Sequence, residues 1–454
     1  MAKYNYSDLE VYDKKYVWHP FTQMRGFCQD KPLIIAEAQG CRLIDTEGNS
    51  YLDGVSSLWT NVHGHRKEKL DRALIDQAGR IAHSTLLGLA NIPSILLAKK
   101  LVDIAPPGLT KVFYSDSGST SVEIALKMAF QYHQQAADGS RRKTKYICFN
   151  NAYHGDTIGS VSVGGIDLFH SVYHELLFPA FKVEAPYCYR CPLGLEHPAC
   201  NLMCLGEMEQ VMEERKDEIA ALIIEPLVQG AGGILVHPEG YLRRVRELCT
   251  KHDIFMICDE VAVGFGKTGK MFACEHEGVS PDIMALAKGI AGGYLPLAAT
   301  LTSERVYEGF LGEFAEFKTF FHGHTFTGNP LACAVAIASL EVFEEEKTLE
   351  ALQEKIDLLT RRLEEFKTLE HVGEVRQRGV MIGIELVADK ATKAMYPPEQ
   401  RMGHRVILEA RKRSVIIRPL GDVVVLMPPL AISLEEIDQL CDVVYDSIKQ
   451  VTEG

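Results

Sequence analysis

Ser115–Thr120 (Ser-Asp-Ser-Gly-Ser-Thr) is the first segment whose residue types suit chemistry. It follows an expected strand at Lys111–Tyr114 and opens an expected helix. Free amides and hydroxyls at a helix N-terminus suit one phosphate group, although a plain Ser/Thr N-cap would explain the same residues. The expected helix has apolar residues at helical spacing: Val122, Ala125, Leu126, Ala129 and Tyr132.

Two further polar residues follow expected strands. Asp259 ends the apolar run Ile254–Cys258, where a carboxylate could hold a metal, a ribose or a pyridinium nitrogen, or could simply end the strand. Lys288 lies 29 residues later, after Ile283–Leu286. Apolar surroundings disfavour its ammonium form and make it an amine nucleophile and base, whereas an isolated lysine is more often a surface residue.

Together these features predict a single cofactor site. A phosphate cup at Gly118 and Ser119, a pyridinium partner at Asp259 and a Schiff-base lysine at Lys288 are the minimum that pyridoxal 5′-phosphate requires. Tyr153 follows another expected strand, Tyr146–Phe149, where an aromatic ring could stack on the cofactor. The sequence therefore predicts a pyridoxal-phosphate enzyme.

The elements that must position these residues indicate an α/β fold. Short apolar runs alternate with helices from about residue 66 onward, as in a mostly parallel central sheet whose strand ends gather ligands. Short β segments precede this region at 33–35, 41–45 and 51–53. A charged helix at 349–366 and a strand at 381–386 follow it. We expect a large cofactor domain at 56–345 and a small α+β domain formed by both chain ends, 1–55 and 346–454.

Composition and charge exclude several classes of protein. The 454 residues are 46% hydrophobic and 24% charged, which is typical of a globular protein. The net charge of −13 argues against binding to nucleic acid. We expect no membrane span and no secretory signal, and therefore a cytoplasmic location with mostly reduced cysteines among the twelve.

Two motifs point elsewhere. Gly264–Gly269 spells G-x-G-x-x-G, but no clear long helix follows it, so a glycine-rich loop beside a different site is the better interpretation. Four cysteines with C-x2-C-x8-C-x3-C spacing could hold a structural metal or be free thiols. They are Cys188, Cys191, Cys200 and Cys204. We place no metal in the predicted active site, and the alternative of a metal-bound interaction protein organised by these cysteines stays open.

Beyond single motifs, residues 16–450 resemble the class III aminotransferases of the fold type I pyridoxal-phosphate enzymes. Trp18–Met24, Phe321–Ala334 and Arg418–Asp422 resemble the subgroup that converts 8-amino-7-oxononanoate to 7,8-diaminononanoate in biotin biosynthesis. The resemblance implies ping-pong transamination with that acceptor. A different ω-amino acid or amine substrate is the alternative within the same enzyme class.

The resemblance also implies residue roles. Lys288 would carry the cofactor and move the proton, Asp259 would pair with the pyridine nitrogen, and Tyr153 would cover the ring. Gly118 and Ser119 would bind the phosphate. Thr325 and the backbone near His324 of a second subunit would help them, which implies a homodimer with shared active sites.

Substrate residues follow from the same resemblance. Arg418 would bind the carboxylate of the keto substrate, Gly323 would lie along its path, and Trp59 would form an apolar wall. Glu225 would lie near the cofactor, with its role left open. We expect S-adenosylmethionine as the amino donor. Phe21, Leu58 and His324 stand where users of that donor typically have Tyr, Trp and Pro, so lysine is the alternative donor.

Overall fold

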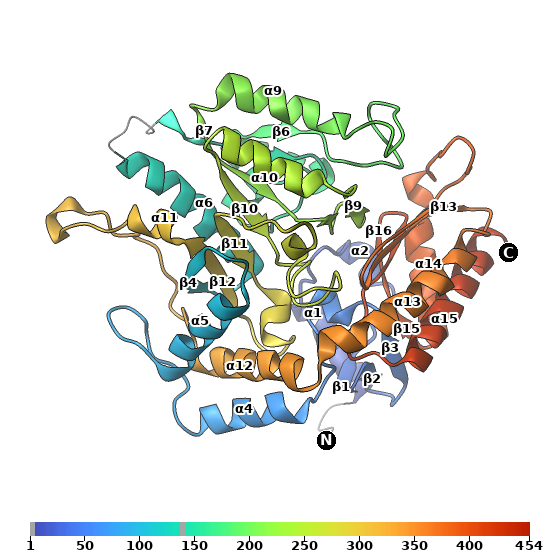
Figure 1. The fold of residues 1–454 in the computed structure, drawn as a ribbon. Helices are drawn as coiled ribbons and strands as arrows, with labels where there is room; N and C mark the ends of the chain where they lie inside the picture. The colour runs from blue at the N-terminus through green and yellow to red at the C-terminus, as the bar shows by residue number, and fades with distance from the viewer. Residues whose placement is uncertain (1–4, 137–141) are drawn as a thin grey trace.

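The computed structural model describes residues 5–136 and 142–454. Seven strands in this part of the chain form one central sheet (Figure 1). In spatial order they are β4 (Leu109–Ser115), β12 (Ala298–Ser303), β11 (Ile283–Leu286), β10 (Phe255–Asp259), β7 (Ile219–Ile224), β5 (Lys145–Phe149) and β6 (Phe181–Val183). The α/β fold class with a mostly parallel sheet is confirmed.

Both faces of this sheet are buried, which is why its strands are continuous apolar runs. In β10, Phe255 and Ile257 pack in one cluster with residues of α6 (Gly118–Gln135). Met256 and Cys258 point to the other face and pack in a cluster that includes α10 (Tyr241–Lys251). Alternate side chains therefore enter opposite cores, and neither face leaves a polar pattern in the sequence.

The sequence analysis missed two strands of the sheet, β6 and β12, and β12 runs antiparallel to the others. β12 pairs antiparallel with both β11 and β4. Its sequence, Ala-Ala-Thr-Leu-Thr-Ser, lacks the run of large apolar residues that revealed its neighbours. It nevertheless lies buried between β11 and β4, and α6 packs against it.

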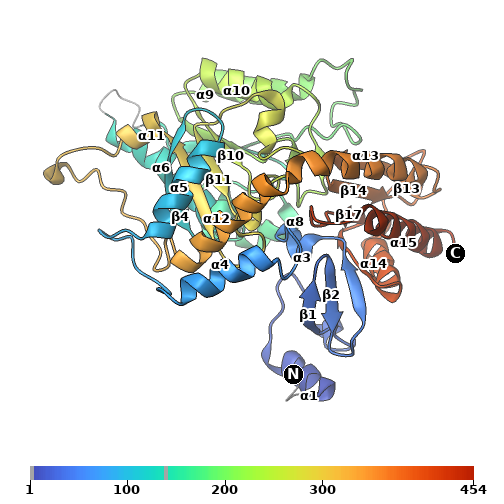
Figure 2. The same cartoon turned by 60° about the horizontal axis from the view of Figure 1, so that its bottom comes forward.

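The remaining helices cover the sheet or build the ends of the molecule (Figures 1 and 2). In the described residues the other α-helices are α1 (Tyr6–Tyr16), α2 (Met24–Phe27), α3 (Ser56–Trp59), α4 (Glu68–Ala78), α5 (Ile92–Ile104), α7 (Ile158–Ser162), α8 (Asp167–His170), α9 (Gly206–Arg215), α11 (Glu304–Glu308), α12 (Pro330–Glu345), α13 (Thr348–Phe366), α14 (Met402–Lys412) and α15 (Leu434–Thr452). No helix of this set is long and apolar enough to cross a membrane.

The two chain ends share a small sheet. β1 (Ile35–Gln39), β2 (Arg42–Asp45) and β3 (Ser50–Asp53) pair in sequence, and β3 then pairs in parallel with β15 (Val415–Ile416). The expected first strand at 33–35 was misplaced. Pairing in the β1–β2 hairpin, from Ile35 opposite Asp45 to Gln39 opposite Arg42, determines where β1 begins and ends. Local hydrophobicity does not determine these bounds.

A second C-terminal sheet lies beside the central domain, as Figure 1 shows at the red end of the chain. It contains β13 (Val372–Arg378), β14 (Met381–Leu386), β17 (Val423–Leu426) and β16 (Arg418–Leu420), with β8 (Val228–Gln229) and β9 (Leu235–Val236) forming a separate pair. The domain boundaries after residues 55 and 345 stay a prediction.

Candidate active site

A cavity of about 700 Å³ opens at the carboxyl ends of the central strands. That volume is typical of small-molecule sites. Of the residues that the sequence singled out, the cavity brings together Lys288, Asp259, Tyr153, Gly118, Ser119 and Trp59, along with Glu225. They come from six segments spread over more than 200 residues. Most of these segments follow strands of the central sheet, and parallel strands end at the same edge of the sheet.

One wall of the cavity is the N-terminus of α6. Ser117 caps the helix: its Oγ accepts from the Thr120 amide, while Thr120 Oγ1 accepts from the Ser117 amide. The amides of Gly118 and Ser119 belong to the first turn, where a helix offers them no acceptor. A Cβ at Gly118 would lie 2.5 Å from Cγ1 of Val261, so glycine is needed for the close approach of this turn to the end of β10.

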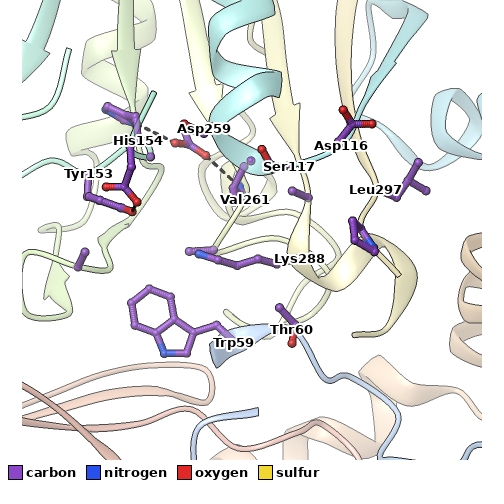
Figure 3. A pocket seen from close by; sticks show the side chains of 18 of the residues that line it. Trp59, Thr60, Asp116, Ser117, Tyr153, His154, Asp259, Val261, Lys288 and Leu297 are labelled. Atoms are coloured by element: carbon purple, nitrogen blue, oxygen red, sulfur yellow. Dashed lines mark hydrogen bonds and ion pairs between the residues drawn. The ribbon is translucent and has the colours of Figure 1, made fainter. Parts of the chain in front are cut away.

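Lys288 enters the cavity from the segment after β11. Its backbone is in the left-handed region, with φ of +47°, where a non-glycine residue is strained. Burial lowers the pKa of its amine, while the carboxylates of Asp259 and Glu225 oppose that shift. Nζ lies 4.7 Å from the centroid of the Trp59 ring (Figure 3). A buried amine with a lowered pKa is suited to nucleophilic and proton-transfer chemistry.

Asp259 is held in place by two hydrogen bonds (Figure 3). Nδ1 of His154 lies 2.7 Å from Asp259 Oδ2, and the amide of Val261 donates to Oδ1 over 3.0 Å. His154 and Asp259 are both buried. Sequence reasoning missed His154, although it directly follows Tyr153. Its partner lies 105 residues away, and only the fold brings the two together.

Tyr153 and Glu225 form the wall next to His154. Glu225 accepts from the Tyr153 amide over 3.1 Å and from the Gly230 amide over 2.9 Å. Burial raises the pKa of Glu225 to about 7, so it changes protonation state in the neutral range. Burial also raises the pKa of Tyr153, and the hydrogen bond from its hydroxyl to Asp156 adds to the shift.

Arg418 lies on β16, half-buried, and is not part of the cavity lining. Burial lowers the pKa of its guanidinium, and its positive charge in turn lowers the pKa of Tyr153 and of Lys288. Within the described residues its side chain has no hydrogen bond or ion pair. This cation is therefore available to an anionic ligand near Tyr153.

The other expected site residues lie outside the cavity lining. Phe21 is 60% exposed, and its ring packs edge-on against Phe169, with 5.5 Å between the ring centroids. Leu58 is 47% exposed, although its neighbour Trp59 is buried. The sequence grouped Phe21 and Leu58 with the substrate pocket, but in a single chain both face outward.

His324, Thr325 and Gly323 also lie outside the lining of this chain's own cavity. Nδ1 of His324 lies 2.6 Å from Oδ2 of Asp116, a residue at the cavity edge. Thr325 is exposed, and Gly323 is exposed with open space around its Cα. This segment therefore turns its free groups away from the chain that carries it.

The structure also shows where the glycine-rich motif and the four-cysteine motif lie. The glycine-rich segment Gly264–Gly269 is a buried loop whose Lys267 donates to groups of this same chain, so no nucleotide site forms there. The four cysteines at 188, 191, 200 and 204 are free and line one small cavity of about 20 Å³ together with His197. No group of metal-ligating side chains was found in the described residues.

The family model for class-III aminotransferases matches residues 28–448. The chain belongs to this family. It is 60% identical over 445 residues to an adenosylmethionine-8-amino-7-oxononanoate aminotransferase of Nitratidesulfovibrio vulgaris, which covers 98% of this chain and 82% of the relative. The similarity to the family therefore extends over almost the whole length of this aminotransferase.

Solved structures agree with this assignment. The crystal structure of adenosylmethionine-8-amino-7-oxononanoate aminotransferase from Methanocaldococcus jannaschii is similar with a TM-score of 0.94 and 48% identity, covering 98% of this chain and 99% of that one. An (S)-enantioselective omega-transaminase from Thermomicrobium roseum also gives a TM-score of 0.94, at 34% identity, covering 99% and 100%. The fold is that of the pyridoxal-phosphate-dependent transaminases.

The cofactor of this family is pyridoxal phosphate, and the residues present fit it. The cavity lining offers free helix amides, a buried carboxylate and an amine with a lowered pKa near Trp59. The absence of a side chain at Gly118 lets these groups converge. Phosphate, ring nitrogen and aldehyde each find a group of suitable chemistry.

Proposed function

We propose that this aminotransferase transfers an amino group from S-adenosylmethionine to 8-amino-7-oxononanoate and so forms 7,8-diaminononanoate. The single observation that carries the chemistry is the cavity in which Lys288, Asp259 and the N-terminus of α6 converge. The substrates are those named for the relatives at 60% and 48% identity. Transamination of this acceptor is a step of biotin biosynthesis.

Pyridoxal phosphate, when bound, supplies a ring that withdraws electrons from the carbon bearing the amino group. Lys288 Nζ provides the nucleophilic amine and then moves a proton between substrate and cofactor atoms. Burial suits it to both tasks, because a lowered pKa favours the unprotonated amine. Trp59 lies against this amine and keeps water away from it.

Asp259 holds a proton on the ring nitrogen. His154 and the Val261 amide fix its carboxylate so that it needs no reorganisation during turnover. Tyr153 covers the ring, and the amides of Gly118 and Ser119 bind the phosphate. Each role uses a group of this chain that lines the cavity.

Arg418 binds the carboxylate of the acceptor. Its guanidinium is half-buried, has no hydrogen-bond or ion-pair partner in the described chain, and lies close enough to Tyr153 and Lys288 to shift their pKa values. A planar guanidinium binds a carboxylate through two parallel hydrogen bonds. The same group orients the acceptor with its ketone toward Lys288.

The donor has an alternative in lysine, and the enzyme has an alternative in a general ω-amine transaminase. Phe21 and Leu58 favour lysine, because neither offers the hydroxyl or the indole expected for S-adenosylmethionine. The similarity to the (S)-enantioselective omega-transaminase favours the alternative of a general ω-amine transaminase. Both alternatives keep the same residues around the cofactor.

The working unit is a homodimer in the cytoplasm. Large apolar side chains are exposed around the N-terminus of α5 and beside Thr325: Leu87, Leu89, Ile92, Ile95, Leu96 and Phe326. The two segments that carry this apolar patch are adjacent, since Asn91 Nδ2 donates to the Gly328 carbonyl and His83 packs on Phe326. A second copy that covers the patch brings its Thr325 and His324 to the partner's phosphate. The twelve free cysteines support a reducing compartment.

Mixed dimers test the sharing of sites. Thr325→Ala and Lys288→Ala chains with different tags are co-expressed, and the heterodimer is isolated through both tags. One of its sites then combines Lys288 of one chain with Thr325 of the other, so cofactor affinity and activity return to that site. A heterodimer with no more activity than the Thr325→Ala homodimer contradicts sharing.

The substrate assignment is tested with the purified enzyme, pyridoxal phosphate and 8-amino-7-oxononanoate. S-adenosylmethionine, lysine or a simple ω-amine is added as sole donor, and 7,8-diaminononanoate is measured by mass spectrometry. We expect the product with S-adenosylmethionine. If the product forms with lysine and not with S-adenosylmethionine, lysine is the donor. A lack of product with every donor, while a simple ω-amine still aminates a small keto acid, overturns the acceptor.

A further inference from the structure

Lys267, in the glycine-rich loop after β10, is a buried cation that the proposed chemistry does not use. It is 1% exposed. Its Nζ donates to Ser56 Oγ over 2.8 Å and to the carbonyls of Asn61 and Pro428, each over 3.3 Å. An ammonium group has three N–H donors, and here all three are used. No carboxylate of the described residues forms an ion pair with it.

These bonds join segments far apart in the chain. Ser56 and Asn61 flank the turn that follows β3, and Pro428 follows β17 of the C-terminal sheet. Ser56 Oγ donates onward to the carbonyl of Met427 over 2.6 Å. The carbonyls of Asn61 and Pro428 have no other hydrogen bond within the described residues. In the described residues the Lys267 amine is therefore the only donor to these two carbonyls, and it links the segments around residues 56–61 and 428.

The turn that Lys267 holds is strained. Ser56, Ser57, Leu58 and Trp59 have φ angles of 51°, 56°, 109° and 67°, so four consecutive non-glycine residues are in left-handed conformations. Each such residue costs roughly 1–3 kcal/mol and persists only where surrounding contacts impose it. Asp53, which is also buried, accepts from Ser57 Oγ and from the Val55 amide. Lys267 donates to Ser56 Oγ and to the Asn61 carbonyl.

The last residue of the turn is Trp59, whose ring lies 4.7 Å from Lys288 Nζ. The ring is 5% exposed and packs so closely on Gly230 that a Cβ there would lie 3.2 Å from it. Among the described residues the indole nitrogen has no hydrogen-bond partner, so the backbone of the turn and packing orient the ring. A turn that relaxed toward ordinary φ angles would carry this ring away from Lys288.

We propose that Lys267 is a positioning residue that locks the Ser56–Trp59 turn and thereby sets the indole of Trp59 against the Lys288 amine. This deepens the proposed function, since Trp59 lines the same cavity. Burial lowers the pKa of Lys267 to about 7, the charges of Asp53 and Cys41 oppose that shift, and the Lys288 charge adds to it. The deprotonated amine still has two N–H donors, so the lock persists in part above neutral pH.

The chain has two tryptophans, which makes the proposal directly measurable. Trp18 is 87% exposed, and Trp18→Phe leaves the buried Trp59 as the only indole emitter. In that background, Lys267→Met keeps the length of the side chain and removes its donors. Lys270→Met, three residues on and exposed, is the matched control. Emission spectra and acrylamide quenching are recorded on the full-length protein without substrate, before and after addition of pyridoxal phosphate.

Lys267→Met is expected to shift Trp59 emission to longer wavelength and to increase its quenching, whereas Lys270→Met leaves both unchanged. Unchanged emission and quenching in a folded Lys267→Met protein overturn the proposal. Ser56→Ala keeps the lysine and removes one of its acceptors, together with the bond from Ser56 Oγ to the Met427 carbonyl, so it should move Trp59 in the same direction by less. It decides the matter if Lys267→Met does not fold, and an unchanged Ser56→Ala spectrum then counts against the proposal.

A double variant separates the lock from two independent defects. If Ser56 acts through Lys267, Lys267→Met/Ser56→Ala should quench no more than Lys267→Met alone. Additive quenching contradicts the coupling. None of these readouts needs a donor or an acceptor, so a wrong substrate assignment leaves them intact. Activity adds one check: Lys267→Met should raise KM for the acceptor more than Lys270→Met does.

Discussion

The centre and the rim of the active site are built in different ways. At the centre, Asp259 and Glu225 are buried and Lys288 is half-buried, and neighbours of the same chain hold the two carboxylates. At the rim, Phe21, Leu58 and the 323–325 segment are exposed. The difference teaches that one chain folds its acid–base groups into place by itself. The rim residues that we assign to the substrate, Phe21, Leu58 and Gly323, are left exposed by a single chain.

The largest effect should come from the centre. Lys288→Ala removes both the nucleophile and the proton carrier, so transamination should fall by roughly 10⁴-fold, while the protein still folds. Lys270→Ala, an exposed lysine, serves as the control and should keep its activity. The measurement is the rate of amino transfer with saturating cofactor. A residual rate within tenfold of the parent (about 1.4 kcal/mol) would place the amine elsewhere.

Asp259→Asn tests the second central group. It keeps the size of the side chain and removes the charge that holds a proton on the ring nitrogen, so kcat should drop by about 10²–10³-fold. Asp116→Asn changes a carboxylate at the edge of the same cavity and should cost much less. Equal losses in the two variants contradict the distinction between centre and rim.

Arg418 tests the rim. Arg418→Lys keeps the charge but loses the paired hydrogen bonds, so KM for the acceptor should rise about tenfold with little change in kcat. Arg361→Lys, on the exposed face of α13, is the matched control. Steady-state kinetics with varied acceptor decides this. A fall in kcat without a change in KM assigns Arg418 to the chemistry instead.

The smallest effect concerns Glu225 and pH. Its folded pKa of about 7 lies above its unfolded value of 4.5, so the folded state binds the extra proton between these values. Wild-type stability from this group is present below pH 4.5 and is lost as the pH rises through 7. Glu225→Gln stays neutral, so its Tm relative to wild type should rise from acid to alkaline pH.

Thermal melts at several pH values measure that difference. The exposed Glu239→Gln variant controls for the loss of one carboxylate. Glutamine cannot accept from both the Tyr153 and Gly230 amides, so its absolute Tm can be lower at every pH. The slope of the difference is therefore the decisive quantity. A flat difference across the neutral range contradicts a shifted carboxyl at the centre.

The sequence predicted the centre better than its supports. Asp259 ends one short apolar strand and Lys288 follows another, and parallel strands place their ends together, so the local pattern was enough. His154 could not be linked to Asp259, because their contact joins residues 105 apart. β12 was missed because small and hydroxyl residues replace large apolar ones in a buried strand.

The left-handed Ser56–Trp59 turn could not be predicted either, because long-range contacts impose it. Its sequence, Ser-Ser-Leu-Trp, contains no glycine or asparagine that would announce positive φ angles. Long-range contacts from Asp53 and Lys267 impose the conformation, and the glycine-rich pattern around Lys267 points toward nucleotides instead. A backbone conformation that tertiary contacts impose leaves no pattern in the local sequence.

Reductive trapping tests the central claim most directly. The enzyme loaded with pyridoxal phosphate is treated with borohydride, which fixes the cofactor to the lysine that carries it, and the digested protein is mapped by mass spectrometry. The account predicts a phosphopyridoxyl group on Lys288, and none in a Lys288→Ala protein treated in the same way. Labelling of Lys267 or of any other lysine in place of Lys288 would contradict it.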